Sequence, residues 1–327
     1  MPGVLLILTG LLLAWVVGAN DAANSMGTAV GSGVRTPRQG AVLAGVCGLA
    51  GAILMGGRVV KTLGEGILPL PDLPVVFAQL IAVSALAAAG LTVLTCTGLR
   101  LPVSTSHAVT GGLVGGGFSA GVQSLIAWRE TARIFCAWFF TPVAACLLAV
   151  VIYRLGRYLF AQKNFFYLSD RAGKILVTIT GCYMAFSWGA NDVANATGVL
   201  SGILAFPPLL ITLAGGMVMV CGVLIWGERI MLTVGKKITR LSPATALAAE
   251  FTAAVVVHFF TLAGLPVSTT HAIVGAVGGI GLSKGKKSVT LPLLGGIVLT
   301  WMVTPFFAGS LAFFLYRLLQ LAVVMTG

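Results

Sequence analysis

Long apolar runs dominate the chain, and polar residues gather in short stretches between them. In the first half, these runs predict helices at about 3–34, 38–57, 74–99 and 132–153, with a Gly-rich segment at 102–120 before the last of them. Such runs match the roughly 20 residues that cross ~30 Å of hydrocarbon as a helix. They lack the apolar–polar alternation that is typical of a transmembrane β-strand. The pattern therefore predicts an all-α polytopic membrane protein.

The sequence of the first half returns in the second half, in the same order. "GANDAAN" at 18–24 is matched by "GANDVAN" at 189–195, and "LPVSTSHAV" at 101–109 is matched by "LPVSTTHAI" at 265–273. Near the end of each half, "WFFTP" is matched by "WMVTP". This order indicates a tandem duplication. We therefore expect an N-terminal transmembrane repeat at 1–155, a short connector at 156–172 and a C-terminal repeat at 173–327.

The distribution of Lys and Arg predicts how the two repeats are oriented. If each repeat crosses the membrane an odd number of times, one face collects three quarters of the 20 Lys and Arg residues, whereas an even number leaves three fifths there. Loops rich in Lys and Arg lie on the cytoplasmic side, which favours the odd number. The repeats would then be inverted, with the connector around Lys163 in the cytoplasm and both termini outside. Inverted repeats recur in secondary transporters, with the substrate bound near the membrane midplane between them.

Composition supports a membrane protein and excludes other classes. Hydrophobic residues make up 58% of the chain and charged residues 9%, with a mean hydropathy of +1.03. A soluble domain carries roughly 25% charged residues. The net charge of +12 lies in loops between spans, so it indicates orientation and not nucleic-acid binding. No nucleophile–base pair and no metal-binding His/Cys cluster stand outside the repeated motifs, so we expect neither an enzyme nor a resident cofactor.

Each copy of the GAND motif puts one carboxylate and two amides inside an apolar span: Asn20, Asp21 and Asn24, then Asn191, Asp192 and Asn195. Carboxylates inside a membrane are costly and usually mark an ion path. The flanking glycines, Gly18 and Gly27 in the first copy, predict that the helix breaks and frees carbonyls to line a cavity. Because oxygen ligands suit hard cations, we expect both motifs to bind Na⁺. A hydrogen-bonding role between packed helices is the alternative.

A second repeated motif, PVST[ST]H, supplies the opposite chemistry. Pro and Ser/Thr fit the first turn of a helix, whose N–H groups attract anions. We expect an oxyanion to be bound by the hydroxyls of these motifs together with residues of the GAND motifs: Ser104, Thr105, Ser106, Ser268, Thr269 and Thr270, with Asp21, Asn24, Asp192 and Asn195. Ordinary helix capping is the alternative. The carboxylates can accept the O–H groups of phosphate but repel sulfate, which favours phosphate.

One further carboxylate, Glu250, falls inside an apolar span of the second repeat. It matches Gln79 of the first repeat at the spacing of 171 that relates the two GAND motifs. We expect Glu250 to be a third cation site or a proton site, with a hydrogen-bonded packing residue as the alternative. His107 and His271, which end the two PVST motifs, are either orienting hydrogen-bond partners or proton carriers.

The two pairs of motifs resemble those of the inorganic phosphate transporter (PiT) family, and the resemblance extends over essentially the whole chain. It implies a symporter that imports inorganic phosphate with Na⁺ or H⁺ as the coupling ion. It also implies inverted repeats and a homodimer in the cell membrane. By this resemblance, the GAND residues line the ion and phosphate site, and the PVST hydroxyls line it from the tips of hairpins.

The sequence departs from the family pattern at two points. Its connector is shorter than that of many members, and Trp188 stands where many carry His before the second GAND motif. Some short bacterial relatives look like sulfate permeases, so sulfate transport on the same fold is one alternative. An anion channel is a more distant one, because a channel calls for a continuous polar stripe, whereas the polar residues here gather at two points.

Overall fold

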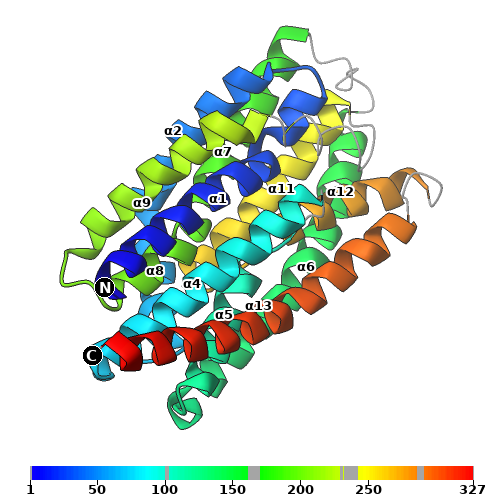
Figure 1. Cartoon of the computed structure of the whole chain (residues 1–327). Helices are drawn as coiled ribbons and strands as arrows, with labels where there is room; N and C mark the ends of the chain where they lie inside the picture. The colour runs from blue at the N-terminus through cyan, green and yellow to red at the C-terminus, as the bar shows by residue number, and fades with distance from the viewer. Residues whose placement is uncertain are drawn as a thin grey trace.

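The computed structural model describes residues 2–99, 103–160, 170–228, 231, 242–285 and 291–326, which are almost entirely helical (Figure 1). The helices of the first half are α1 (Pro2–Gly31), α2 (Pro37–Met55), α3 (Gly57–Lys61), α4 (Val75–Gly98), α5 (Thr105–Ser119) and α6 (Trp128–Phe160). Those of the second half are α7 (Asp170–Asp192), α8 (Ala194–Ser201), α9 (Pro208–Gly222), α11 (Pro243–Leu262), α12 (Thr269–Lys284) and α13 (Leu291–Thr326).

Within the described residues, seven helices are long and apolar enough to cross a membrane. The four ranges expected for the first half correspond to α1, α2, α4 and α6, and the Gly-rich segment forms α5. The prediction of an all-α polytopic protein is therefore confirmed. The division into repeats at 1–155 and 173–327 stays a prediction, and residues 161–169 of the expected connector lie outside the described residues.

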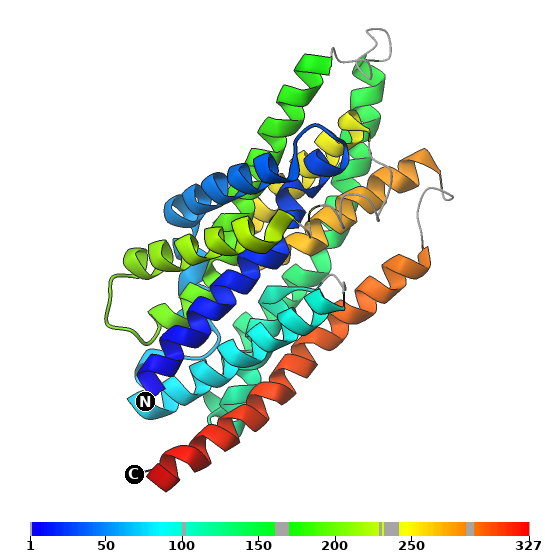
Figure 2. The ribbon, with the colours of Figure 1, turned by 45° about the horizontal axis from the view of Figure 1, so that its top comes forward.

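Each half contains a hairpin of two helices, α4–α5 in the first and α11–α12 in the second (Figure 2). Both chain termini lie at one end of the molecule, whereas α6 ends and α7 begins at the opposite end (Figure 1). The α4–α5 hairpin enters from the end that holds the termini, and the α11–α12 hairpin enters from the other end. The two halves are therefore inverted copies, as the charge distribution predicted.

The two halves interlock, because helices of one pack on helices of the other. Helix α1 packs on α9 and α2 on α7, while α5 lies against α13 and α12 against α6. The first glycine of each GAND motif allows this approach: a Cβ on Gly18 would collide with the backbone of Met219 in α9, and a Cβ on Gly189 would collide with that of Gly48 in α2. Such small residues let membrane helices come close enough for their backbones to touch.

The expected helix breaks at the two GAND motifs are not present as predicted. Helix α1 runs without interruption from Pro2 to Gly31 through the first motif. In the second, the single residue Val193 separates α7 from α8, and it keeps helical angles, φ −56° and ψ −34°. A continuous helix satisfies its own backbone groups, which a membrane interior strongly favours. Because Gly18 serves helix packing, it does not need to serve a break, and the polar atoms at these motifs are side chains.

Candidate functional site

The tips of the two hairpins meet inside the molecule. The Ser106 hydroxyl donates to the Val267 carbonyl over 3.0 Å, and the Thr270 hydroxyl donates to the Val103 carbonyl over 3.4 Å. Ser104 and Ser268 cap the helices that follow them, since each hydroxyl accepts the backbone N–H of the histidine three residues on, over 3.3 Å. The N-terminal ends of α5 and α12, with their partial positive charge, therefore face each other.

The GAND carboxylates lie against these tips in a symmetric pair of contacts. Thr105 donates to Asp21 Oδ2 over 3.0 Å, and Thr269 donates to Asp192 Oδ2 over 2.9 Å. In each case, the carboxylate and the hydroxyl belong to the same half of the chain. All four side chains are at most 3% exposed, so each carboxylate depends on its protein partners and on whatever else binds there.

The GAND amides make the complementary contacts across the two halves. Asn195 Nδ2 donates to the Thr105 hydroxyl over 3.0 Å. Asn24 Nδ2 donates to the hydroxyls of Thr269, over 3.3 Å, and Thr270, over 2.8 Å. Thr105 and Thr269 are therefore each held by an aspartate of their own half and by an asparagine of the other. We call these six residues, Asp21, Asn24, Thr105, Asp192, Asn195 and Thr269, the central cluster.

Two acceptor atoms of the central cluster lack a hydrogen-bond donor among the described residues. Asp192 Oδ1 and Asn195 Oδ1 are buried and make no hydrogen bond with any residue that the structure describes. Among the described residues, the ion pair that is present joins Arg133 to Glu130 at the surface, so neither Asp21 nor Asp192 is neutralised by Lys or Arg. Both oxygens of Asp21 accept hydrogen bonds, so the unpartnered acceptors are one carboxylate oxygen of Asp192 and the amide oxygen of Asn195. Such buried oxygens suit a small cation, or the O–H groups of a protonated oxyanion.

The remaining GAND amides, Asn20 and Asn191, position the site. Asn191 Nδ2 donates to the Thr261 hydroxyl over 2.9 Å and to the Leu265 carbonyl over 3.1 Å, and its Oδ1 accepts the Val267 N–H over 3.0 Å. It thus ties down the chain that leads into α12. In the first half, Asn20 Oδ1 accepts from Thr97 over 3.0 Å, and its Nδ2 donates to Asp21 over 2.8 Å.

The sequence analysis did not identify Thr97 and Thr261 as partners of the GAND amides, although their positions carry a pattern. Each stands five residues before the proline of a PVST motif, so a threonine recurs at the same place in both repeats.

A proline in each final helix orients the two PVST histidines. Pro142 lies inside α6 and Pro305 inside α13, and because proline has no N–H, the carbonyl four residues earlier loses its helical partner. Those carbonyls belong to Trp138 and Trp301. His271 Nδ1 bonds to the Trp138 carbonyl over 3.1 Å, and His107 Nδ1 bonds to that of Trp301 over 2.9 Å. A carbonyl only accepts, so each Nδ1 carries the hydrogen, which favours the orienting role over proton carriage.

Comparison with known proteins assigns a family to this architecture. The profile of the phosphate transporter family matches residues 17–172 and again residues 169–312. The chain belongs to the phosphate transporter family.

Individual members of the phosphate transporter family resemble the chain along most of its length. A protein of Thermococcus kodakarensis named as a candidate phosphate permease is 32% identical, over 96% of this chain and 97% of its own. The Arabidopsis thaliana protein named inorganic phosphate transporter 2-1, chloroplastic, is 30% identical, over 91% of this chain and 69% of its own. A solved structure named the sodium-dependent phosphate transporter superposes with a TM-score of 0.89 at 29% identity, covering 97% of this chain and 98% of that one. These likenesses point to a membrane permease and not to an enzyme.

Glu250 stands apart from the central cluster in this transporter. Its carboxylate accepts from the Thr28 hydroxyl, from the Ala29 N–H over 3.2 Å and from the Thr180 hydroxyl over 3.2 Å, and it is fully buried. Glu250 thereby joins α11 to α1 and α7.

The pairing of Glu250 with Gln79 needs correction. Counted back from the PVST proline, the residue of the first repeat that corresponds to Glu250 is Leu86, which is buried, whereas Gln79 is only half-buried and lies near Gly3. The stretch between the GAND and PVST motifs is shorter in the second repeat, so one spacing does not hold throughout.

Proposed function

We propose that this protein is a secondary transporter that imports inorganic phosphate together with Na⁺ by alternating access. The observation that carries the proposal is the central cluster, in which Thr105 and Thr269 each need an aspartate of one half and an asparagine of the other. A movement of one half relative to the other would separate these partners. The same groups would then be exposed to one side of the membrane after having been exposed to the other.

The chemistry of the cluster supports phosphate as the transported oxyanion. Hydroxyls and helix N-termini supply neutral donors, which can bind an anion and still release it. Asp21 and Asp192 supply acceptors for the O–H groups that phosphate carries and sulfate lacks. The names of the relatives and of the structural neighbour all refer to phosphate. Sulfate is the competing substrate that an experiment has to exclude.

A cation is needed to balance the buried carboxylates, and Na⁺ fits the oxygen atoms present. The structural neighbour is described as sodium-dependent, which supports the same ion. We assign the ion and the oxyanion to Asp21, Asn24, Asp192, Asn195 and the hydroxyls of Thr105 and Thr269. Asn20 and Asn191 hold the arrangement in place, and Ser104 and Ser268 cap α5 and α12. Glu250 is a further cation or proton site. H⁺ in place of Na⁺ is the alternative for the coupling ion.

For the membrane orientation, we propose that the connector is cytoplasmic and that both termini lie outside, as the positive-inside rule requires. We also propose that the protein works in the cell membrane as a homodimer, each protomer with its own central cluster.

Uptake by purified protein in liposomes tests the proposal. Labelled phosphate is added outside, with an inward gradient of Na⁺, an inward gradient of H⁺, or neither, and labelled sulfate is run in parallel. We expect phosphate uptake that requires the Na⁺ gradient and that excess unlabelled sulfate does not inhibit. Uptake without any cation gradient, at a rate that does not saturate, would indicate a channel and contradict the proposal. Sulfate uptake equal to that of phosphate would contradict the substrate assignment.

A further inference from the structure

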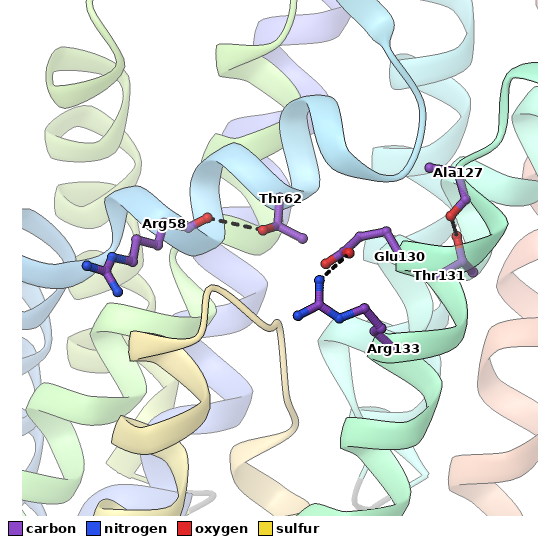
Figure 3. A network of polar contacts seen from close by, with 6 residues as sticks. All are labelled: Arg58, Thr62, Ala127, Glu130, Thr131 and Arg133. Carbon is purple, nitrogen blue, oxygen red and sulfur yellow. Dashed lines mark hydrogen bonds and ion pairs between the residues drawn. The ribbon is translucent and has the colours of Figure 1, made fainter.

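A cleft opens at the end of the molecule where both termini lie. It is bounded by α3, by the start of α6 and by the turn that follows α11, and Figure 3 shows Arg58 and Thr62 on one side with Glu130 and Arg133 on the other. The cleft measures about 490 Å³. An adjoining cleft of about 400 Å³ shares Arg58 and Leu262 with it and reaches Thr261. We call the two together the mouth cleft.

Arg58 ties the rim of the mouth cleft to the α11–α12 hairpin. Its guanidinium donates to the carbonyl of Leu262, the last residue of α11. Carbonyls at the end of a helix have no helical partner and carry partial negative charge, so a cation is favoured there. The backbone of Arg58 also lies on the turn itself, because a Cβ on Gly264, where φ is +72°, would be 3.5 Å from Arg58 Cβ and from Thr62 Oγ1.

The same turn leads directly to the central cluster. Thr261 lies in the wall of the mouth cleft, and its hydroxyl accepts a hydrogen bond from Asn191 Nδ2 over 2.9 Å. Asn191 Nδ2 also donates to the carbonyl of Leu265, just beyond the turn. The next residue along α7 is Asp192, which binds Thr269. One hydrogen bond and one peptide step therefore separate the mouth cleft from a carboxylate of the central cluster.

The charges in the mouth cleft favour an anion. Arg58 and Lys61 line it together with Glu65 and Glu130. Glu130 is engaged by Arg133 over 2.8 Å, which leaves Glu65 alone to offset two cations. A concave site with excess positive charge raises the local concentration of anions. Among the residues that the structure describes, no Lys or Arg forms an ion pair with the central cluster, so Arg58 and Lys61 are cations that an oxyanion can meet before it arrives there.

We propose that the mouth cleft is the entrance for the oxyanion and that Arg58 is the latch that holds the α11–α12 hairpin closed over it. This inference rests on the proposed transport of phosphate. An incoming oxyanion competes with the neutral Leu262 carbonyl for the Arg58 guanidinium, and the charge-assisted bond to the anion is the stronger of the two. When Arg58 turns to the oxyanion, the turn at Gly264 is released and the hairpin can move. Arrival of substrate is thus coupled to opening.

The first test compares uptake by Arg58→Gln and Lys61→Gln. Lys61→Gln is the matched control, because it removes an equal charge from the mouth cleft and leaves the bond to Leu262 in place. We expect Arg58→Gln to raise KM for phosphate about tenfold, the effect of losing a charged hydrogen-bond donor to the substrate, with kcat nearly unchanged. Lys61→Gln should raise KM about threefold or less. Equal increases of KM in the two variants would mean that Arg58 only attracts the anion through its charge, and would contradict its role as a latch.

The second test measures release of the turn and does not depend on transport. The labelled variant is Leu265→Cys. Leu265 follows the turn and is half-buried, so release of the turn should expose it further. The substitution keeps the hydrogen bond from Asn191, which goes to the backbone carbonyl of Leu265. The variant's reaction rate with a membrane-impermeant maleimide is compared with that of the protein without the substitution, which gives the background of the six native cysteines. We expect phosphate, but not chloride at equal ionic strength, to raise the rate. Adding Arg58→Gln should raise it severalfold without phosphate, and Lys61→Gln should not.

The outcomes separate this inference from the proposed function. If the protein transports phosphate but Arg58→Gln labels at the same rate as the Leu265→Cys parent, the latch is wrong and the transport assignment stands. If no phosphate uptake occurs in any form of the protein and phosphate leaves the labelling rate unchanged, the proposed function has failed and the inference falls with it.

Discussion

Replacing Thr269 by valine tests whether the hairpin tips bind the oxyanion or only cap their own helices. Valine keeps the branched shape of the side chain and removes the hydroxyl. That hydroxyl donates to Asp192 Oδ2 over 2.9 Å and accepts from Asn24 over 3.3 Å. Asp192 Oδ1 has no hydrogen-bond partner within the described part of the chain, so the variant removes the remaining donor to this carboxylate there.

The expected magnitude follows from the loss of the bond to Asp192. A hydrogen bond to a charged group is worth roughly 1.5–3 kcal/mol, which corresponds to about ten- to a hundredfold in affinity. Thr105→Val, which removes the equivalent bond to Asp21, should have a similar effect. Ser268→Ala is the matched control, because Ser268 caps α12 through the His271 N–H. Loss of a cap costs about 1 kcal/mol of stability and leaves the oxyanion ligands in place.

Phosphate affinity and melting temperature are therefore measured on the same purified samples of Thr269→Val, Thr105→Val and Ser268→Ala. We expect both valine variants to lose affinity beyond any loss of stability, and Ser268→Ala to lose stability with nearly unchanged affinity. If the valine variants melt at lower temperature but bind phosphate as tightly as the unsubstituted protein, the hydroxyls are structural and the oxyanion binds elsewhere.

Three further predictions address coupling, topology and the histidine contacts. Asp21→Asn and Asp192→Asn should each lower the rate of Na⁺-driven uptake by at least about a hundredfold, because each removes a charge that binds the cation. The variants should still elute as folded protein. Uptake at the rate of the unsubstituted protein would contradict the cation assignment. Lys163→Cys should react with impermeant maleimide only from the cytoplasmic side, and labelling from outside would invert the proposed orientation. Pro305→Ala should restore the N–H that pairs with the Trp301 carbonyl and so weaken the bond of His107 to that carbonyl. We expect uptake to fall severalfold with the melting temperature unchanged or higher, and unaltered kcat would show that this contact is dispensable.

The sequence predicts most of the fold because the duplicated motifs and the apolar runs are local patterns. Repetition of GAND and PVST indicated two related halves, and the placement of Lys and Arg indicated that they are inverted. The buried carboxylates, Asp21 and Asp192, also stood out, because charges in apolar runs are rare. The role of the flanking glycines could not be predicted. Gly18 packs against the backbone of Met219, which lies far away in the sequence, and only the folded structure shows that contact.

Contacts between the halves were the second feature that the sequence could not predict. The pairing of Asn195 with Thr105, and of Asn24 with Thr269, depends on how two inverted units interlock. The Arg58 contact with Leu262 depends in the same way on where the hairpin turn comes to rest. A repeated sequence predicts which residues play equivalent roles within each unit. It does not predict which of the two units supplies the hydrogen-bond partner of a given residue.

The central cluster is symmetric, but its support is not, and this difference bears on how the transporter changes state. Two inverted repeats with identical contacts would have two conformations of equal free energy, related by the two-fold axis between the repeats. Glu250 removes that equality, because it binds the α11–α12 hairpin to Thr28 of α1 and Thr180 of α7, whereas the corresponding residue of the α4–α5 hairpin is Leu86. One hairpin is therefore held by buried hydrogen bonds that the other lacks. Under the proposed alternating access, the duplication would supply two conformations, and the divergence at Glu250 would set the balance between them.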